Sequence, residues 1–241
     1  MAGQKARKRK GTIAAGIAGR LRMLRRWALR GLAGGFLAIL LAVLLFAFVN
    51  PPWGFYMIGE YRRIGSIERQ WVPMESINPH MARAAVAAED ANFCLHWGFD
   101  MNEIRRALEQ DARRGASTIS QQTVKNVFLW HGRSWIRKAL EAGMTPMVEA
   151  AWSKRRILEV YLNVAEFGEG IFGVEAAARH HFDVPASALS LRQSARLAAI
   201  LPDPRNRNPN RLSPALQRRA AMIEDGAQTI RRDGRSACFE D

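Results

Sequence analysis

Residues 31–49, GLAGGFLAILLAVLLFAFV, are nineteen successive positions without a charged side chain. A helix of about 20 apolar residues spans the hydrocarbon core of a bilayer. The thirty residues before this run contain ten Lys and Arg and no acid, so they carry most of the net charge of +14. The positive-inside rule then predicts a basic cytoplasmic tail over residues 1–30, a transmembrane signal anchor over residues 31–50 and an exported remainder.

A cleaved signal peptide is the main alternative to an anchor. Its basic region would be unusually long, and no clear Ala-x-Ala site follows the apolar run. A basic tail can also bind nucleic acid. Its position directly before an apolar span favours membrane topology instead, and we expect no nucleic-acid partner.

The rest of the chain is predicted to be a linker over residues 51–74, with one strand-like stretch, and one mainly α-helical domain over residues 75–241. Apolar residues recur there at helical spacing, and Gly, Pro or Asn interrupts the pattern between segments. The predicted helices cover residues 79–93, 101–114, 118–129, 134–151, 153–163, 171–182, 190–201 and 213–232.

The two cysteines, Cys94 and Cys238, are too few for a disulfide framework. Cys238 lies in a polar C-terminal segment, so we expect that segment to be mobile and the two thiols not to form a structural disulfide. The five histidines show no HExxH or related spacing. The sequence therefore predicts no protein-held metal site.

Two adjacent acids, Glu89 and Asp90, follow a run of small apolar residues and precede Phe93 and His96. In a continuous helix Glu89 and Phe93 would share one face. A partly desolvated carboxylate beside an aromatic ring has a raised pKa, which suits a general base at neutral pH. The alternative is an exposed acidic pair near a helix end, with Asp100 capping the next helix. These residues alone leave both interpretations open.

Hydroxyl, amide and ammonium groups are concentrated in residues 115–126, GASTISQQTVKN. Free N–H groups at a helix start, with hydroxyls and a lysine nearby, can bind phosphate. Thr118 and Gln121 have the spacing of a capping box, which is a structural explanation for part of the pattern. That explanation leaves Gln122 and Lys125 unassigned, and the spacing of a Walker loop is absent.

A third segment of interest, which is basic, contains Arg137, Lys138 and Glu141. Arg137 and Glu141 have i, i+4 spacing, so an ordinary helix-surface ion pair is one explanation. The other is an anion site in which Glu141 organises the two cations. Trp130 and Trp135 stand beside this segment, as at a surface that dips into a membrane interface, although a core corner would use the same residues.

A fourth segment begins with Lys154 and Arg155 at a predicted helix start, where the helix dipole disfavours cations. This is a mild indication of ligand binding. The apolar stripe that follows is assigned to the core, and the glycines of residues 168–170 allow a tight turn.

Taken in this order, the segments resemble the motifs of the peptidoglycan glycosyltransferases, glycosyltransferase family 51, and most of all its short membrane-anchored monofunctional members. Residues 89–100 match EDxxFxxHxGFD, residues 115–126 match GGSTIxQQxxKN with Ala116 in place of the second Gly, residues 137–141 match RKxxE, residues 154–163 match KxxILExYLN, and residues 189–209 resemble a fifth motif. The resemblance covers residues 75–210.

The resemblance implies a lysozyme-like helical large lobe with a small membrane-proximal lobe, preceded by one transmembrane helix. It implies polymerisation of lipid II onto a growing lipid-linked glycan strand, with inversion and release of undecaprenyl pyrophosphate. Carried over by position, Glu89 is the catalytic base and Glu141 a second essential carboxylate. The implied substrate-binding residues are Asp90, Phe93, His96, Ser117, Thr118, Gln121, Gln122, Lys125, Arg137, Lys138, Lys154, Arg155, Glu159 and Asn163.

The same resemblance implies Mg²⁺ or Mn²⁺ accompanying the pyrophosphate, no organic cofactor, and division or elongation proteins as partners. It places the protein in a cell inner membrane as a single-pass protein, with the N-terminus cytoplasmic and the catalytic domain periplasmic. Neither SxxK nor KTG of a transpeptidase occurs, so we expect glycan synthesis without cross-linking.

Two other functions are compatible with the same residues. A lysozyme-like hydrolase would use Glu89 as an acid to cut peptidoglycan, and a noncatalytic membrane-anchored protein would use none of these groups chemically. Incubation with lipid-linked disaccharide separates synthesis from cleavage, and Glu89→Gln tests for catalysis.

Overall fold

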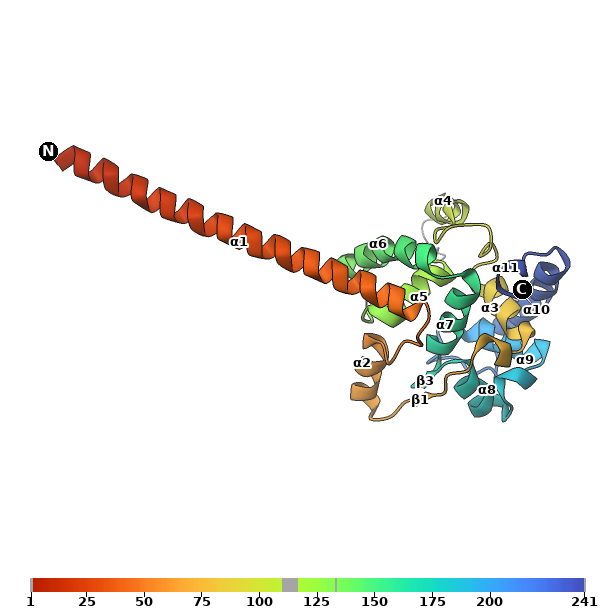
Figure 1. Cartoon of the computed structure of the whole chain (residues 1–241). Coiled ribbons are helices and arrows are strands. Elements are labelled where there is room, and N and C mark those ends of the chain that lie inside the picture. Colours follow the sequence, from red (N-terminus) through yellow and green to blue (C-terminus); the bar gives the residue numbers. More distant parts are fainter. Residues whose placement is uncertain (1, 110–116, 133, 241) are drawn as a thin grey trace. The chain divides into compact units, whose positions relative to one another are not determined.

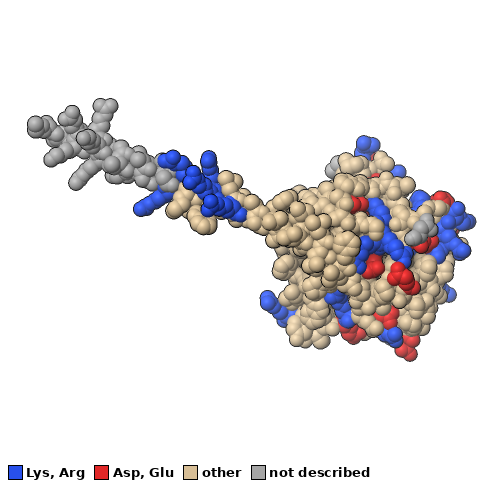
Figure 2. Space-filling view, in the orientation of Figure 1, with Lys and Arg blue, Asp and Glu red and all other residues tan. Residues whose placement is uncertain are grey.

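The computed structural model describes residues 2–109, 117–132 and 134–240 (Figure 1). The chain divides into two units, residues 1–46 and residues 47–241, which we describe separately. The first consists of helix α1, Ala2–Phe46. Its segment Arg22–Phe46 contains an 18-residue window with a mean hydropathy of 2.3 and is long and apolar enough to cross a membrane. Figure 2 shows Lys and Arg gathered on one stretch of α1, followed by an uncharged stretch.

The second unit is mainly helical, as predicted. Ser, Thr or Asn side chains cap the N-termini of most of its longer helices, including Thr118 of a capping box with Gln121. The helices are α2 (Phe55–Ile64), α3 (Pro79–Glu89), α4 (Met101–Glu109), α5 (Ile119–Phe128), α6 (Trp135–Ala151), α7 (Lys154–Val164), α8 (Val174–Phe182), α9 (Leu191–Ile200), α10 (Pro214–Arg232) and α11 (Ala237–Glu240), with short 3₁₀ turns at Met74–Ser76 and Ala186–Ala188. The predicted helix segments are confirmed, apart from shifted ends and residues 110–116, which lie outside the described ranges.

Residues 51–74 are more than the expected linker. They contain α2, which buries Tyr56 and Met57, and strand β1 (Glu68–Arg69) at the predicted strand-like stretch. β1 pairs in parallel with β3 (Ile171–Phe172), which pairs in antiparallel with β2 (Glu166–Gly168). The start of the predicted helix 171–182 is therefore a strand, because the glycine-rich stretch forms a hairpin.

Small residues let α3, α9 and α10 pack closely at one side of this unit (Figure 1). Gly226 of α10 faces Ala87, where an added Cβ would approach the Ala87 Cβ to 3.2 Å. This close contact places α10 beside the C-terminal end of α3. The shared core consists of Ala84, Ala195, Ala198, Ala199, Ala220, Ile223 and Ala227.

The expectation that Cys94 and Cys238 stay unpaired is wrong, because the structure joins them in a disulfide. The C-terminal segment is short and polar, but Phe239 is fully buried. Its ring lies 6.4 Å from that of Phe93, centroid to centroid. Burial of the Phe239 side chain holds α11 against the domain and brings Cys238 to the loop that contains Cys94.

Candidate active site

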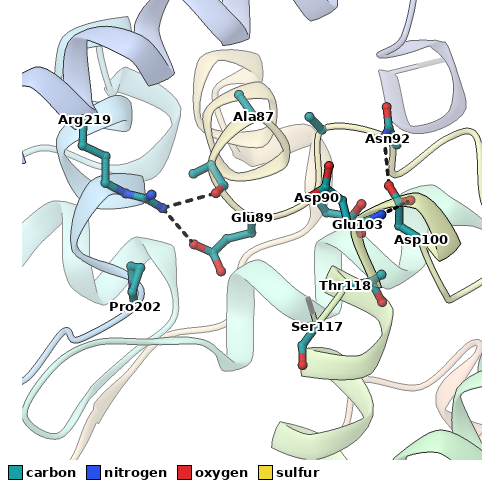
Figure 3. Close-up of a pocket in the computed structure, with 12 residues that line it drawn as sticks. Ala87, Glu89, Asp90, Asn92, Asp100, Glu103, Ser117, Thr118, Pro202 and Arg219 are labelled. Atoms are coloured by element: carbon teal, nitrogen blue, oxygen red, sulfur yellow. Dashed lines mark hydrogen bonds and ion pairs between the residues drawn. The ribbon is translucent and has the colours of Figure 1, made fainter. Parts of the chain in front are cut away.

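Glu89 is the last residue of α3, and its carboxylate is held by side chains from two other helices. Gln122 Nε2 of α5 donates to Glu89 Oε2 at 3.0 Å. Arg219 Nη2 of α10 lies 3.5 Å from Glu89 Oε1 (Figure 3). The Glu89 side chain is only 13% exposed. Burial raises the pKa of Glu89, and the bond from Gln122 with the charges of Arg219 and Lys125 opposes that rise only in part.

The chain leaves the helix directly after Glu89, at Asp90. The prediction that Glu89 and Phe93 share a helix face is therefore wrong. Asp90 accepts hydrogen bonds from His96 Nε2 at 2.7 Å and from the backbone N–H of Ile119 at 3.0 Å. Asp90 thus fixes the turn after α3 to the first residue of α5 and orients the local backbone, and its assignment to substrate binding stays a prediction.

Two cavities meet near Glu89. The larger, of about 550 Å³, is lined by Glu89, Asp90, Ser117, Thr118 and Arg219, among others (Figure 3). The smaller, of about 250 Å³, is lined by Gln122 and Lys125 and by residues from α2, β2 and the segment after α9. Pro202 lines both. The hydrogen bond from Gln122 to Glu89 therefore links the walls of the two cavities.

Asp100, the last residue of the first motif, has a structural role. Its Oδ1 accepts from the backbone N–H groups of Asn102 and Glu103, both at 3.0 Å, at the start of α4. Its Oδ2 accepts from Asn92 at 2.8 Å. The predicted capping role of Asp100 is confirmed.

The second and third motifs meet through a charged network. Glu141 is 3% exposed and pairs with Arg137 Nη1 at 2.8 Å and with Lys138. Lys138 Nζ also donates to Ser117 Oγ at 3.1 Å. The i, i+4 pair is present, but Glu141 is buried and the Arg137 side chain is only 13% exposed, so removal of one partner would leave a largely desolvated charge unpaired. Residues 115, 116 and 133 lie outside the described ranges.

Lys125 lies within the electrostatic reach of Glu89 and Glu141, and its ammonium has no hydrogen-bond or ion-pair partner among the described residues. Burial lowers the pKa of Lys125, and the negative charges of Glu141 and Glu89 counter only part of that effect. A buried ammonium without a direct ion pair is costly unless another anion is supplied. This position is therefore suited to receive an anionic group of a ligand.

The fourth motif makes structural contacts away from this network. Lys154 Nζ bonds Glu149 and the His96 carbonyl, both at 2.8 Å, and lies 4.5 Å over the centre of the Phe93 ring. Phe93 is fully buried. These contacts explain why a cation at the start of α7 is tolerated.

The remaining residues of that motif also bind protein groups. Arg155 Nη2 pairs with Glu75 at 2.6 Å, and Glu159 pairs with Arg156 at 2.5 Å. Asn163 exchanges two hydrogen bonds with the backbone of Val72, at 2.9 and 2.8 Å. The assignment of these residues to substrate binding stays a prediction.

The sequence interpretation missed a polar cluster at the smaller cavity. The Tyr56 hydroxyl donates to Glu166, and Arg205 Nη2 donates to that hydroxyl at 2.8 Å. Tyr56 stacks on His131 with ring centres 4.6 Å apart. Burial and the bond to Glu166 raise the pKa of Tyr56. Because residues 51–74 were assigned to a linker, no signal pointed to Tyr56.

Arg219 was missed as well. It belongs to α10, outside the segments singled out for chemistry, and directly precedes buried Ala220 on that helix. Its neighbour Arg218 is exposed. The one available signal was this position at the edge of the buried stripe that contains Ala220, Ile223 and Ala227.

Comparison with known proteins identifies the family of this chain. A family model described as Transglycosylase matches residues 57–228. A "Biosynthetic peptidoglycan transglycosylase" from Jannaschia sp. (strain CCS1) is 58% identical over 216 residues, which cover 90% of each chain. Proteins of the same name from Rhodospirillum centenum (strain ATCC 51521 / SW) and Yersinia pseudotuberculosis serotype O:3 (strain YPIII) are 47% and 53% identical, covering 91% and 74% of this chain and 97% and 79% of theirs.

The chain therefore belongs to the transglycosylase family, and its activity is that of a glycosyltransferase. The match begins at residue 57, within α2. This agrees with the inclusion of α2 in the second unit rather than in a linker.

Proposed function

We propose that this protein polymerises lipid II into peptidoglycan strands in cell wall biosynthesis, with release of undecaprenyl pyrophosphate. The observation that carries the proposal is Glu89, a carboxylate that is only 13% exposed, has a raised pKa and lines the larger cavity, while its partner Gln122 lines the smaller one. A carboxylate with a pKa closer to neutral takes a proton more readily than an exposed one.

In this proposal the 4-hydroxyl oxygen of the acceptor sugar attacks C1 of the growing strand. Its proton passes to the Glu89 carboxylate as the new C1–O bond forms. The bond between C1 and the pyrophosphate oxygen breaks, and its electron pair leaves with the lipid pyrophosphate. The attack from the opposite face converts the α-linkage to a β-linkage. Gln122 supports this step by fixing one carboxylate oxygen.

The leaving pyrophosphate requires positive charge. Lys125 offers an ammonium without a direct partner among the described residues, within the electrostatic reach of Glu89 and Glu141. Arg137 and Lys138 add two more cations, and Glu141 holds both in place. In this assignment Glu141 acts by organising cations on the leaving-group side, and Ser117, bonded to Lys138, binds substrate with Thr118.

Mg²⁺ or Mn²⁺ is expected only with the pyrophosphate. Among residues 2–109, 117–132 and 134–240, no group of three or more His, Cys, Asp or Glu side chains is placed to hold a metal ion. The donor set of these described residues does not fit a resident metal centre, and the proposed reaction needs none. Polymerisation with and without a chelator tests the requirement.

The proposed location is a cell inner membrane, with the second unit periplasmic. The uncharged residues 31–46 of the candidate span Arg22–Phe46 follow a cationic tail, and the Cys94–Cys238 disulfide is typical of an oxidising compartment. Trp135 and Ile136 are exposed at the start of α6, which supports contact with lipid at the interface. Division or elongation proteins stay predicted partners.

The decisive experiment is incubation of the detergent-solubilised full chain with lipid II. Growth of glycan strands supports the proposal, and Glu89→Gln should abolish that growth without unfolding the protein. Cleavage of intact wall without strand growth would instead support the lytic alternative. Strands that form without peptide cross-links are expected, because neither SxxK nor KTG occurs in these 241 residues.

A further inference from the structure

Arg219 of α10 reaches across to the last turn of α3. Its Nη2 donates to the carbonyl oxygen of Ala88 at 3.2 Å and lies 3.5 Å from Glu89 Oε1 (Figure 3). The Arg219 Nε is buried and has no hydrogen-bond partner among the described residues. One donor of the Arg219 guanidinium is thus left without a hydrogen bond while another faces the Glu89 carboxylate.

The position of this guanidinium follows from the packing of α10. Ala220, next in sequence, is buried in the small-residue core shared with α3. The last carbonyls of a helix lack intrahelical partners, and cations are favourable at a helix C-terminus. Arg219 satisfies both conditions at the end of α3. From that place it also meets the side chain of Glu89.

The two oxygens of Glu89 are held from opposite helices. Gln122 of α5 bonds Oε2 at 3.0 Å, and Arg219 faces Oε1. The other charged or titratable groups that face Glu89 are Lys125 of α5, Asp90 after α3 and Tyr161 of α7. Lys125 is the second cation near Glu89, but it is shared with Glu141.

We propose that Arg219 is a positioning residue of the reaction, which holds the Glu89 carboxylate from the side of α10 and keeps it in the form that accepts a proton. This inference rests on the proposed role of Glu89 as the base. Arg219 acts through Glu89, and no contact of Arg219 with substrate is required.

The first test is the pH dependence of kcat/KM for Arg219→Gln and Arg219→Lys, with Arg218→Gln as the matched control. Arg218 is the exposed neighbour on the same helix. Arg219→Gln should lose about ten- to a hundredfold at neutral pH and recover part of that loss at alkaline pH. The sign follows because a nearby cation favours the ionised carboxylate, so its removal moves the acidic limb to higher pH. Arg219→Lys should keep the limb in place.

A second test needs no catalytic activity. A double-mutant cycle compares four Tm values, those of the wild type, Glu89→Gln, Arg219→Gln and the double variant. At about pH 8, Arg219→Gln should lower the Tm more when Glu89 is present than when it is Gln, and at about pH 4 this difference should disappear. Additive Tm changes at both pH values would overturn the proposal. So would an Arg219→Gln profile that is merely scaled down at every pH.

The two tests also separate this inference from the proposed function. If the wild-type chain fails to polymerise lipid II, the proposed function is wrong, whereas the mutant cycle still measures the coupling of Arg219 to Glu89. If the wild type polymerises lipid II and the cycle is additive, only the role of Arg219 is rejected.

Discussion

The Cys94–Cys238 disulfide gives the sharpest stability prediction. It joins the loop after α3 to α11, 144 positions along the chain. The perturbation is either chemical reduction or the paired substitution Cys94→Ala with Cys238→Ala. Both release the C-terminal segment from the loop that contains Asp90 and His96, which fix the turn below Glu89.

The magnitude follows from the length of the closed loop. In the chain-entropy account, a link between residues 144 positions apart lowers the entropy of the unfolded state and so raises its free energy by about 5 kcal/mol, and removal of native disulfides costs about 2–5 kcal/mol in measured cases. For a domain of this size, 1 kcal/mol shifts the Tm by about 2–4 °C. Reduction should therefore lower the Tm of the second unit by roughly 5–20 °C.

The assay is thermal unfolding of the detergent-solubilised chain, followed by tryptophan fluorescence with and without reductant. Thiol labelling of the unfolded protein verifies how many cysteines are free. The paired alanine variant is the control, because its Tm should match that of the reduced wild type and should not respond to reductant. An unchanged Tm after complete reduction of the wild type would refute the reasoning.

Three further changes have distinct expected outcomes. Glu89→Gln should lower the polymerisation rate at least about a hundredfold and should raise the Tm at neutral pH. Because the folded-state pKa of Glu89 is raised, its protonated form contributes stability that is present below the unfolded pKa and is lost as the pH rises through the folded pKa. A Tm gain that persists unchanged at about pH 4 would contradict this reasoning. Burial lowers the pKa of Lys125, so the alkaline limb of the kcat–pH profile should begin below the usual pKa range of lysine. Lys125→Arg should move that limb to higher pH, and identical profiles of the two proteins would argue against a role of Lys125 in the reaction. Gly98 and Gly65 both have a φ of +84°, but an added Cβ lies 2.6 Å from Thr145 Cγ2 at Gly98 and in open space at Gly65. Gly98→Ala should cost about 2 kcal/mol more than Gly65→Ala in chemical unfolding, and equal losses would show that the contact is relieved.

Local patterns in the sequence were sufficient for the helices and for much of the site. The capping box of Thr118 and Gln121, the capping by Asp100 and the pair of Arg137 with Glu141 each involve residues within four positions of one another. The spacing of residues along one helix or turn determines such contacts, so they can be predicted from the sequence without knowledge of the tertiary structure.

Other features depend on residues that are far apart in sequence. Tyr56 and Arg205 meet at the smaller cavity over a separation of 149 positions, and α11 is docked by the single buried side chain of Phe239. No local pattern marks a short apolar anchor in a polar segment. This is why the disulfide and the polar cluster were missed.

The sequence by itself determined a membrane-compatible apolar helix, a mainly helical body and the family to which the chain belongs, because hydropathy, periodicity and motif spacing are local properties. It singled out Glu89, but it placed the residue inside a longer helix beside Phe93. Only the tertiary structure ended α3 at Glu89 and brought Gln122 and Arg219 to its two oxygens. Burial raises the pKa of that carboxylate, and burial is produced by helices that pack together from distant parts of the chain.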